Sequence, residues 1–465
     1  MGVHHPPKAA LPNRCAIRGK RSVPELPRRP IMTSPATAAD LRLGVVVAGI
    51  ALVLVTGLMF GWLARRIRQP MVIGEIFAGI ALGPSVLGFL PGHLTDKLFP
   101  AAARPLLSAV SQVGLVLFMF LVGWEFEKRL LRPHRTAALV ISLSSIGVAF
   151  TLGVGVASLL YGRHAQIAGH HISFFAFALF LGAAMSVTAF PVLARILTDN
   201  GLTKSRVGTL ALAGAAVDDV LAWCMLAYVS AVVSAGGRTG TMVRIAVLAA
   251  LYVAVMLFLV RPLLAVVVGR WAASGQWRSL LIFLCAGAFL SSWATTWIGI
   301  HAIFGAFLFG FVMPREPAGP LTEHLRKPLD HIGLVLLPVF FIVTGLGVNI
   351  GGLGPRQYLE LAAIISVACA GKLLGAILPA RILGFSWSES SALGLLMNTR
   401  GLTELVILNA AVGLGVLDGQ MFTMMVIMAL VTTALAGPLL PRTRAFREPV
   451  PERGARGSAL ADAVR

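Results

Sequence analysis

The sequence predicts an all-α, polytopic membrane protein, and three observations support this prediction. The chain has 465 residues, of which 57% are hydrophobic and only 12% are charged, whereas about a quarter are charged in a typical soluble domain. Apolar stretches recur from Leu43 to Leu440, and each has the roughly 20 residues that a helix needs to cross the lipid hydrocarbon. Strand-type alternation is absent. Helices are therefore the structure expected to satisfy backbone hydrogen bonds in lipid.

About 13 transmembrane helices follow one another along the chain. The continuous apolar stretch 278–314 is divided near Thr296 into two short spans, the alternative being one long helix with a re-entrant piece. Residues 42–441 form the predicted membrane domain, 1–41 a basic, disordered tail, and 442–465 a short basic tail. The expected spans are 43–63, 72–90, 105–124, 136–161, 172–197, 206–234, 242–260, 279–295, 297–313, 331–349, 358–383, 390–414 and 420–440.

The distribution of Lys and Arg predicts the orientation, because cytoplasmic loops are enriched in these residues. If the first helix enters from outside, the inner loops hold seventeen basic residues and the outer loops six. This places the N-terminus outside the cell membrane and the C-terminus in the cytoplasm. Residues 1–31 conflict with the predicted outside location of the N-terminus, since they carry seven basic residues against one acid, Glu25. Either translation begins at Met32, or a disordered basic tail has some surface role.

The net charge of +20 comes largely from these loops and tails. Basic residues beside a membrane face anionic lipid headgroups, so we expect membrane lipid as a partner and no nucleic acid. Cys224, Cys285 and Cys369 lie in apolar spans, without the spacing of a disulfide framework or a zinc site. No cofactor is expected. The sequence contains no metalloprotease or nucleophile-elbow motif, so an enzyme is not expected either.

Charged residues inside the spans are the candidates for function, because each costs a few kcal/mol or more at the bilayer centre. Adjacent carboxylates, Asp218 and Asp219, lie near the middle of the sixth span. Their side chains point about 100° apart on a helix, so one can face a water-filled cavity while the other faces a neighbouring helix. The alternative is an ion cluster without a transport role.

Lys372 lies in the middle of the eleventh span, beside Gly371 and Gly375, which permit close helix contact. A buried ammonium needs an anionic partner, and an Asp of another span is the obvious one. The alternative is a snorkelling or purely structural lysine.

Two spans are expected to be broken rather than continuous. In the fifth, Pro191 removes a helical hydrogen bond, and Ser186 and Thr188 offer oxygen atoms near the break. Broken helices at mid-membrane build ion sites in many transporters. Either break alone could be a simple kink, but two breaks seven spans apart favour two inverted halves. In the twelfth span the interrupting residues are Asn398, Thr399, Arg400 and Gly401.

Arg400 and Glu404 are spaced to pair along one helix, with Glu75 of the second span as an alternative partner. We interpret all three residues mainly as structural.

Together these motifs resemble the monovalent cation/proton antiporter-2 family, which includes Kef-type and NapA-like sodium/proton antiporters. The resemblance extends over most of residues 42–441. The matching strings occur in the same order along the chain, and this order makes the resemblance specific. The matching strings are QPMVIGEIFAGIALGPSVLG (69–88), SVTAFPVLARIL (186–197), AGAAVDDVLAW (213–223), GAFLFGFVMPR (305–315), LPVFFIVTGL (337–346), AGKLLGAIL (370–378) and NTRGLTELVILN (398–409).

The resemblance implies an inverted-repeat antiporter fold with two crossed broken helices, a dimerisation panel and a mobile core that moves like an elevator. It implies that Asp219 binds the transported cation and the proton alternately, and that Asp218 pairs with Lys372. Thr188 and Ser186 match crossover positions that supply oxygen ligands. An Asp-Asp pair implies electrogenic exchange.

The expected function is therefore secondary exchange of a monovalent cation (Na⁺, Li⁺ or K⁺) for protons by a homodimer. The sequence departs from Kef-type members after Pro441, where about 24 residues leave no room for a nucleotide-binding domain. A cation channel or a symporter of the same fold is the alternative function. Selectivity among cations depends on the cavity at ångström precision, so the sequence does not predict which cation is carried.

Overall fold

The computed structural model describes Gly2 and residues 35–440, except 68, 92–93, 126–134, 168–169, 204, 236–237 and 316–317. The predicted C-terminal tail and, apart from Gly2 and residues 35–41, the predicted N-terminal tail lie outside the described residues. Residues 35–41, predicted as the end of a disordered tail, are helical. So do several basic loop residues that support the predicted orientation, such as Lys128 and Lys204.

The described residues are almost entirely helical. Their one sheet is a pair of two-residue strands, β1 (Gln166–Ile167) and β2 (His170–His171), which are antiparallel. The helices are α1 (Pro35–Arg66), α2 (Met71–Leu82), α3 (Leu94–Leu98), α4 (Arg104–Glu125), α5 (Arg135–His164), α6 (Phe174–Ser186), α7 (Phe190–Asp199), α8 (Arg206–Ala235), α9 (Thr239–Val255), α10 (Arg261–Ala273), α11 (Trp277–Ile298), α12 (Ala302–Phe311), α13 (Ala318–Leu321), α14 (Lys327–Leu346), α15 (Pro355–Ile382), α16 (Trp387–Met397), α17 (Leu402–Gly413) and α18 (Gly419–Leu439).

Eleven helical spans in the described part of the chain are long and apolar enough to cross a membrane, which confirms the predicted all-helical membrane fold. Two of the predicted spans are not among these eleven. The span predicted at 297–313 contains only the short helix α12, and the span predicted at 390–414 is divided into α16 and α17.

The span predicted at 242–260 was too short. The helix continues from α9 through a π-helical turn (Met256–Val260) into α10, as one stretch from Thr239 to Ala273. Arg261 and Arg270 therefore belong to a helix and not to a loop. Long arginine side chains can reach the headgroup region from such positions.

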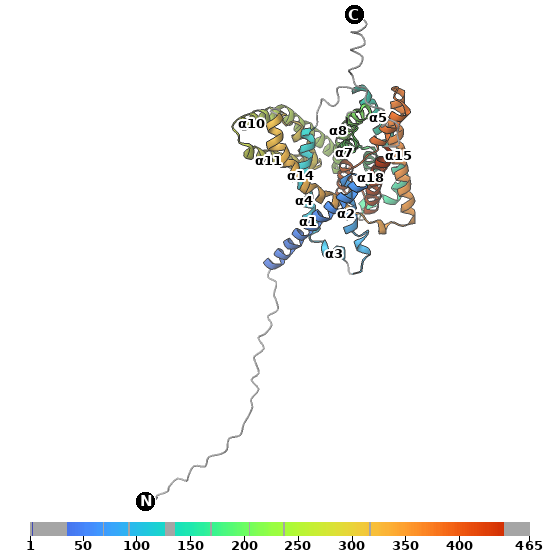
Figure 1. The fold of residues 1–465 in the computed structure, drawn as a ribbon. Helices are drawn as coiled ribbons and strands as arrows, with labels where there is room; N and C mark the ends of the chain where they lie inside the picture. Colours follow the sequence, from blue (N-terminus) through green and yellow to red (C-terminus); the bar gives the residue numbers. More distant parts are fainter. Residues whose placement is uncertain are drawn as a thin grey trace.

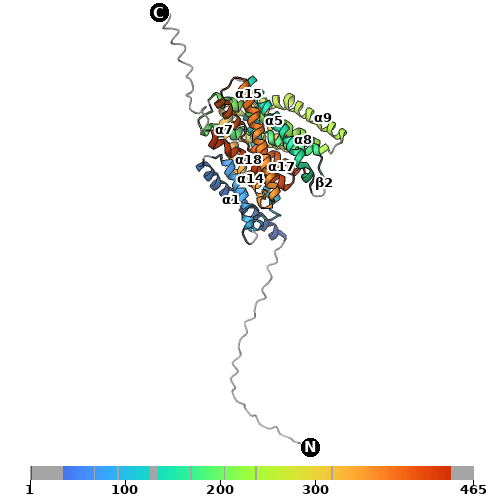
Figure 2. The same cartoon turned by 90° about the vertical axis from the view of Figure 1, so that its right-hand side faces the viewer.

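The helices form two groups, which are visible in Figure 1. We name α1, α2, α4, α11, α12 and α14 the panel group, and α5 to α8 with α15 to α18 the core group. Every extensive contact between long helices of the described chain falls within one group or involves α9 or α10; α9 contacts both α8 and α11. Figure 2, turned by 90° from Figure 1, shows α5, α8, α15 and α18 of the core group facing the viewer.

Glycines allow helices of the panel group to touch through their backbones. A Cβ atom at Gly123 of α4 would lie 2.1 Å from the Phe307 carbonyl oxygen, and one at Gly310 of α12 would lie 2.0 Å from the Phe120 carbonyl oxygen. No side chain fits at such distances, so α4 and α12 pack closely because both positions are glycine.

The same principle brings α15 against α5 in the core group. A Cβ atom at Gly371 would lie 2.9 Å from the Ala149 Cα atom, and one at Gly375 would lie 2.7 Å from the Ser145 Cα atom. Lys372 stands between these glycines and is fully buried. The close helix contact therefore fixes the position of this ammonium group.

Candidate functional site

The two broken helices of the core group meet at their interruptions. The extended segment 187–189 separates α6 from α7, and residues 398–401 separate α16 from α17. The backbone N–H of Ala189 donates to the Thr399 carbonyl oxygen at 3.0 Å. The chain thus crosses itself where helical hydrogen bonding is interrupted, as the family resemblance implies.

The first interruption is not at Pro191. The helix stops at Ser186, and Pro191 is the second residue of α7, where a missing N–H breaks no helical hydrogen bond. At the second interruption, a Cβ atom on Gly401 would lie 2.5 Å from the Val192 Cγ2 atom. Gly401 is therefore required for the close approach of the two segments.

Asp218 lies on α8 with its carboxylate fully buried and paired. Lys372 Nζ is 2.9 Å from its Oδ2 atom, and the Ser142 hydroxyl donates to its Oδ1 atom. Lys372 also donates to the Thr188 hydroxyl oxygen at 2.8 Å, while that hydroxyl donates to the Met397 carbonyl at 2.7 Å. The structure thus joins Asp218, Lys372 and Thr188 in one network.

Asp219 faces different partners although it is the next residue. Its side chain is 5% exposed, and it accepts a hydrogen bond from the Thr403 hydroxyl at 3.0 Å. The backbone N–H of Phe190, the first residue of α7, also donates to it. Among the described residues, no cationic side chain forms an ion pair with Asp219. Its carboxylate is therefore stabilised by dipoles and carries an uncompensated charge when ionised.

Three predicted residues lie at the crossing without touching the carboxylates. Ser186 donates to the Ala183 carbonyl of its own helix at 2.8 Å, and Thr399 donates to the Leu396 carbonyl at 2.8 Å. The Asn398 amide nitrogen is 3.6 Å from the Cys369 sulfur, and its buried Oδ1 atom has no hydrogen-bond partner within the part of the chain that the structure describes.

Arg400 binds the end of the opposite broken helix. Its NH1 and NH2 groups donate to the carbonyls of Ala184 and Met185, each at 2.7 Å, which lie at the unsatisfied C-terminal end of α6. Glu404 lies 3.4 Å from the same guanidinium, and both side chains are fully buried. The guanidinium thus supplies donors and positive charge where α6 lacks them.

Glu75 is buried on α2, in the panel group. Over the residues that the structure covers, no ion pair joins it to Arg400. The acidic partner of Arg400 is thus Glu404 of α17, four residues further along the chain, and the alternative pairing with Glu75 is wrong.

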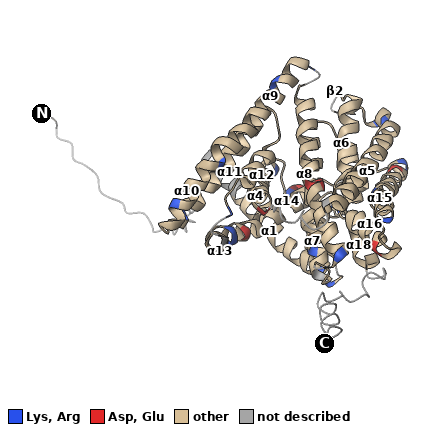
Figure 3. Ribbon diagram, turned by 90° about the horizontal axis from the view of Figure 1, so that it is seen from above, with Lys and Arg blue, Asp and Glu red and all other residues tan. Residues whose placement is uncertain are grey.

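Ser142 and Thr403 were not among the predicted site residues. Ser142 belongs to the polar run SLSS of the fourth span, and Thr403 lies between Arg400 and Glu404. Both runs are unusual inside apolar spans, but hydroxyl groups can bond to their own helix. Figure 3 shows the charged residues mostly at helix ends, with the acidic residues of α8 inside the bundle.

Known proteins match most of this chain in sequence. The family model described as "Sodium/hydrogen exchanger, transmembrane" matches residues 50–444. The Na⁺/H⁺ antiporter NhaS4 of Synechocystis is 41% identical over 401 residues, which cover 85% of this chain and 96% of the relative. Cation/H⁺ antiporter 15 of Arabidopsis thaliana is 36% identical, over 86% of this chain and 48% of its own length. K⁺/H⁺ antiporter 1 of Saccharomyces cerevisiae is 34% identical, over 80% of this chain and 43% of its own length.

The fold is also found in a solved structure. The sodium proton antiporter MjNhaP1 of Methanocaldococcus jannaschii superposes with a TM-score of 0.61, covering 87% of this chain and 98% of its own, at 14% sequence identity.

Proposed function

The chain belongs to the sodium/hydrogen exchanger family, and from this premise we propose that it exchanges a monovalent cation for protons at Asp219. One observation carries the assignment of the residue. Of two adjacent buried carboxylates, Asp218 is paired with Lys372, whereas Asp219 has only dipolar donors. Asp219 is therefore the carboxylate that can accept a positive charge from outside the protein.

Competition for Asp219 couples the two substrates. In a site of low dielectric constant, an ionised carboxylate gains strongly from one neutralising charge, whether this is H⁺ or a metal cation. A second positive charge at the same carboxylate is unfavourable, so proton and cation bind alternately. The Thr403 hydroxyl oxygen, which already contacts Asp219, is an additional ligand, and Thr188 holds Lys372 in place.

The arrangement of helices supports alternating access by movement of the core group against the panel group. The crossing, Asp218, Asp219 and Lys372 all belong to the core group, and in the described chain the helix with extensive contacts to both groups is α9, which packs against α8 and α11. Since Asp218 stays paired with Lys372 in the exchange described above, electrogenic transport requires that this pair also changes its protonation. We propose that it does, as the family resemblance implies.

We further propose a homodimer in the cell membrane, with the N-terminus outside and the C-terminus in the cytoplasm. The stretch Thr239–Ala273 leaves most of its apolar side chains at least partly exposed, and lipid and a second chain are its expected partners. Light scattering of the purified protein should give the mass of two chains, and a monomer would contradict the dimer.

Dye-reported ΔpH in everted vesicles tests the function. Adding Na⁺, Li⁺ or K⁺ should dissipate ΔpH when the carried ion is present, whereas choline should not. Asp219→Asn should abolish the response, because the amide cannot exchange a proton. Asp330→Asn, at a carboxylate that is 47% exposed at the start of α14, is the control and should retain it. Full exchange by Asp219→Asn would reject the assignment.

The same vesicles discriminate the alternatives. A channel would pass cation current without obligatory proton movement, and a symporter would move protons in the same direction as the cation. An imposed membrane potential should change the exchange rate if transport is electrogenic, and should leave it unchanged if it is not.

A further inference from the structure

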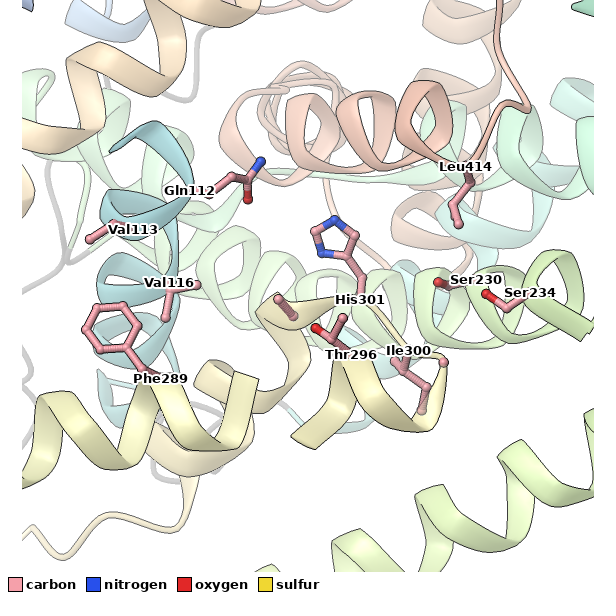
Figure 4. A pocket seen from close by; sticks show the side chains of 12 residues that line it. Gln112, Val113, Val116, Ser230, Ser234, Phe289, Thr296, Ile300, His301 and Leu414 are labelled. Carbon is pink, nitrogen blue, oxygen red and sulfur yellow. The ribbon is translucent and has the colours of Figure 1, made fainter. Parts of the chain in front are cut away.

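A cavity of about 430 Å³ lies between the core group and the panel group. The core group contributes Ser230 and Ser234 of α8, and the panel side contributes Gln112 of α4 and His301 immediately before α12. Figure 4 shows His301 between α4 and the end of α8. The cavity adjoins the last two turns of α8, on the side of the membrane that the predicted orientation assigns to the exterior.

One face of α8 runs from this cavity to the candidate ion site. Ala216, Asp219, Trp223 and Ser230 follow one another at spacings of 3, 4 and 7 residues, which place them on the same face of a helix. At 1.5 Å per residue, Trp223 lies about 6 Å beyond Asp219 and about 10 Å before Ser230 along the helix axis. Trp223 therefore separates the carboxylate from the cavity.

Trp223 packs against α12 across the boundary between the two groups. Its ring lies 6.3 Å from the Phe304 ring and 6.4 Å from the Phe307 ring, measured between centroids. The side chain is 3% exposed. We name the rings of Trp223, Phe304 and Phe307 the aromatic cluster. Phe304 is the third residue after His301, so the cluster begins where the cavity lining ends.

The aromatic cluster presents no group that could pass an ion onward. The indole N–H is buried and has no hydrogen-bond partner among the residues described, and aromatic rings in contact exclude water. Trp223 belongs to the core group and both phenylalanines belong to the panel group. A movement of one group against the other would therefore part the rings without unfolding either helix.

We propose that Trp223 is the gate between the cavity and Asp219, closed by its contact with Phe304 and Phe307 and opened when the two groups move apart. This inference rests on the proposed function, because it concerns the route by which the cation and the proton reach the same carboxylate. It assigns the cavity as the vestibule of the side on which α8 ends.

Thiol accessibility tests the gate without measuring transport. In a background that lacks the native cysteines, Ala216→Cys reports the region beyond the gate and Ser234→Cys reports the cavity. A membrane-impermeant methanethiosulfonate added to the side on which α8 ends should modify Cys at 234, an exposed position, readily and Cys at 216 slowly. Trp223→Ala should accelerate modification at 216 roughly tenfold, the factor that corresponds to about 1.4 kcal/mol of lost aromatic contact.

Trp271→Ala is the matched control. Trp271 lies on α10 and packs against Phe283 at 5.6 Å, so its removal also costs an aromatic contact but leaves the route unchanged. Trp223→Leu keeps an apolar side chain and provides a second variant that folds if the alanine variant does not. The gate is wrong if modification at 216 is as fast with Trp223 as without it, or if Trp271→Ala accelerates it equally.

The two proposals fail differently. If Asp219→Asn keeps full exchange while Trp223→Ala still exposes position 216, the gate stands and the assignment of Asp219 falls. If exchange requires Asp219 but accessibility does not depend on Trp223, the gate alone is overturned.

Discussion

At the scale of residues, Asp218 and Asp219 show how one peptide unit separates two chemical roles. Their side chains leave α8 in different directions, so Asp218 faces α5 and α15 while Asp219 faces α7 and α17. The pairing of Asp218 with Lys372 could be expected from the sequence, because a buried ammonium needs a carboxylate and few are available.

The hydroxyl partners could not be predicted in the same way. Apolar spans contain many Ser and Thr residues, and most of them bond to a carbonyl of their own helix, as Ser186 does. Only the rotation and packing of each helix decide that Ser142 and Thr403 reach the aspartates. The interpretation of Arg400 as structural agrees with its contacts, but its carbonyl partners on α6 depend on the crossing itself.

Lys372→Ala tests the ion pair. The variant leaves Asp218 buried without its partner, and breaking a buried pair in this way costs about 3 to 5 kcal/mol. We expect a large drop in the melting temperature of the detergent-purified protein. The double variant Asp218→Asn with Lys372→Met should recover much of this stability, and equal stability of the single variant and the parent would contradict the pairing.

Arg400→Lys tests the capping of α6. Lysine keeps the charge but cannot donate from two fixed nitrogens to the Ala184 and Met185 carbonyls, and each unsatisfied buried carbonyl costs about 1 to 3 kcal/mol. Stability and exchange should both fall. Arg238→Lys, at an exposed residue directly before α9, should be neutral in both measurements, and an equal loss there would contradict the proposed capping role of Arg400.

At the scale of elements, the sequence predicts that the fifth and twelfth spans are broken, but it places only the second break correctly. The run Asn398 to Gly401 is polar and flexible where a helix needs apolar residues, and α16 ends there. In the fifth span the same reasoning placed the break at Pro191, although proline is tolerated in the first turn of a helix. The break lies before it because Ala189 bonds to Thr399 of the other segment, a contact that no local pattern reveals.

Gly310→Ala tests the contact of α12 with α4. The new methyl group would meet the Phe120 carbonyl oxygen at 2.0 Å, and overpacking of this kind costs about 1 to 3 kcal/mol. The melting temperature should fall. Gly269→Ala in α10, where nothing lies within 4 Å of the added atom, should leave it unchanged or raise it slightly, since alanine favours a helix over glycine.

Asp418 caps α18 and joins it to α5. Its carboxylate accepts from the Met421 N–H at 2.6 Å and lies 2.5 Å from His164 Nδ1. Burial acts to raise the pKa of Asp418, but the hydrogen bonds from His164 and the backbone outweigh it and hold the pKa below its ordinary value. The ionised form therefore stabilises the fold above the ordinary aspartate pKa, and this contribution is lost as the pH falls.

Asp418→Ala should accordingly lower stability at neutral pH by about 1 kcal/mol or more, the usual value of a helix N-cap. The difference from the parent should shrink as the pH is lowered toward 3, because the parent carboxylate is then protonated. Melting temperatures measured between pH 3 and pH 7 check the slope, and a difference that grows on acidification would have the wrong sign.

At the scale of the whole molecule, amino-acid composition does not predict the division into core and panel groups. Helices of both groups are similarly apolar, so their partners follow only from packing. The predicted membrane fold is confirmed, and the family resemblance implied a core and a panel. Which described helices belong to each group comes from the contacts themselves.

Cross-linking tests the movement of these groups. Thr344 of α14 and Asn409 of α17 lie on opposite groups, 3.0 Å apart at their side chains. In a background free of native cysteines, a disulfide between Cys at these positions should arrest exchange, and a reductant should restore it. A disulfide between positions 357 and 420, whose glutamines lie 3.4 Å apart within the core group, should leave exchange intact. Undiminished exchange with the first disulfide formed would argue against relative movement.

The partners of Asp219 have one more consequence. Thr403 and Phe190 both belong to the core group, as do Lys372 and Thr188 behind them. If that group moves as one body, the ion carries its ligands with it and never exchanges one coordination shell for another during the crossing. The ranking of Na⁺, Li⁺ and K⁺ would then be the same whether the ion enters from the outside or from the cytoplasm.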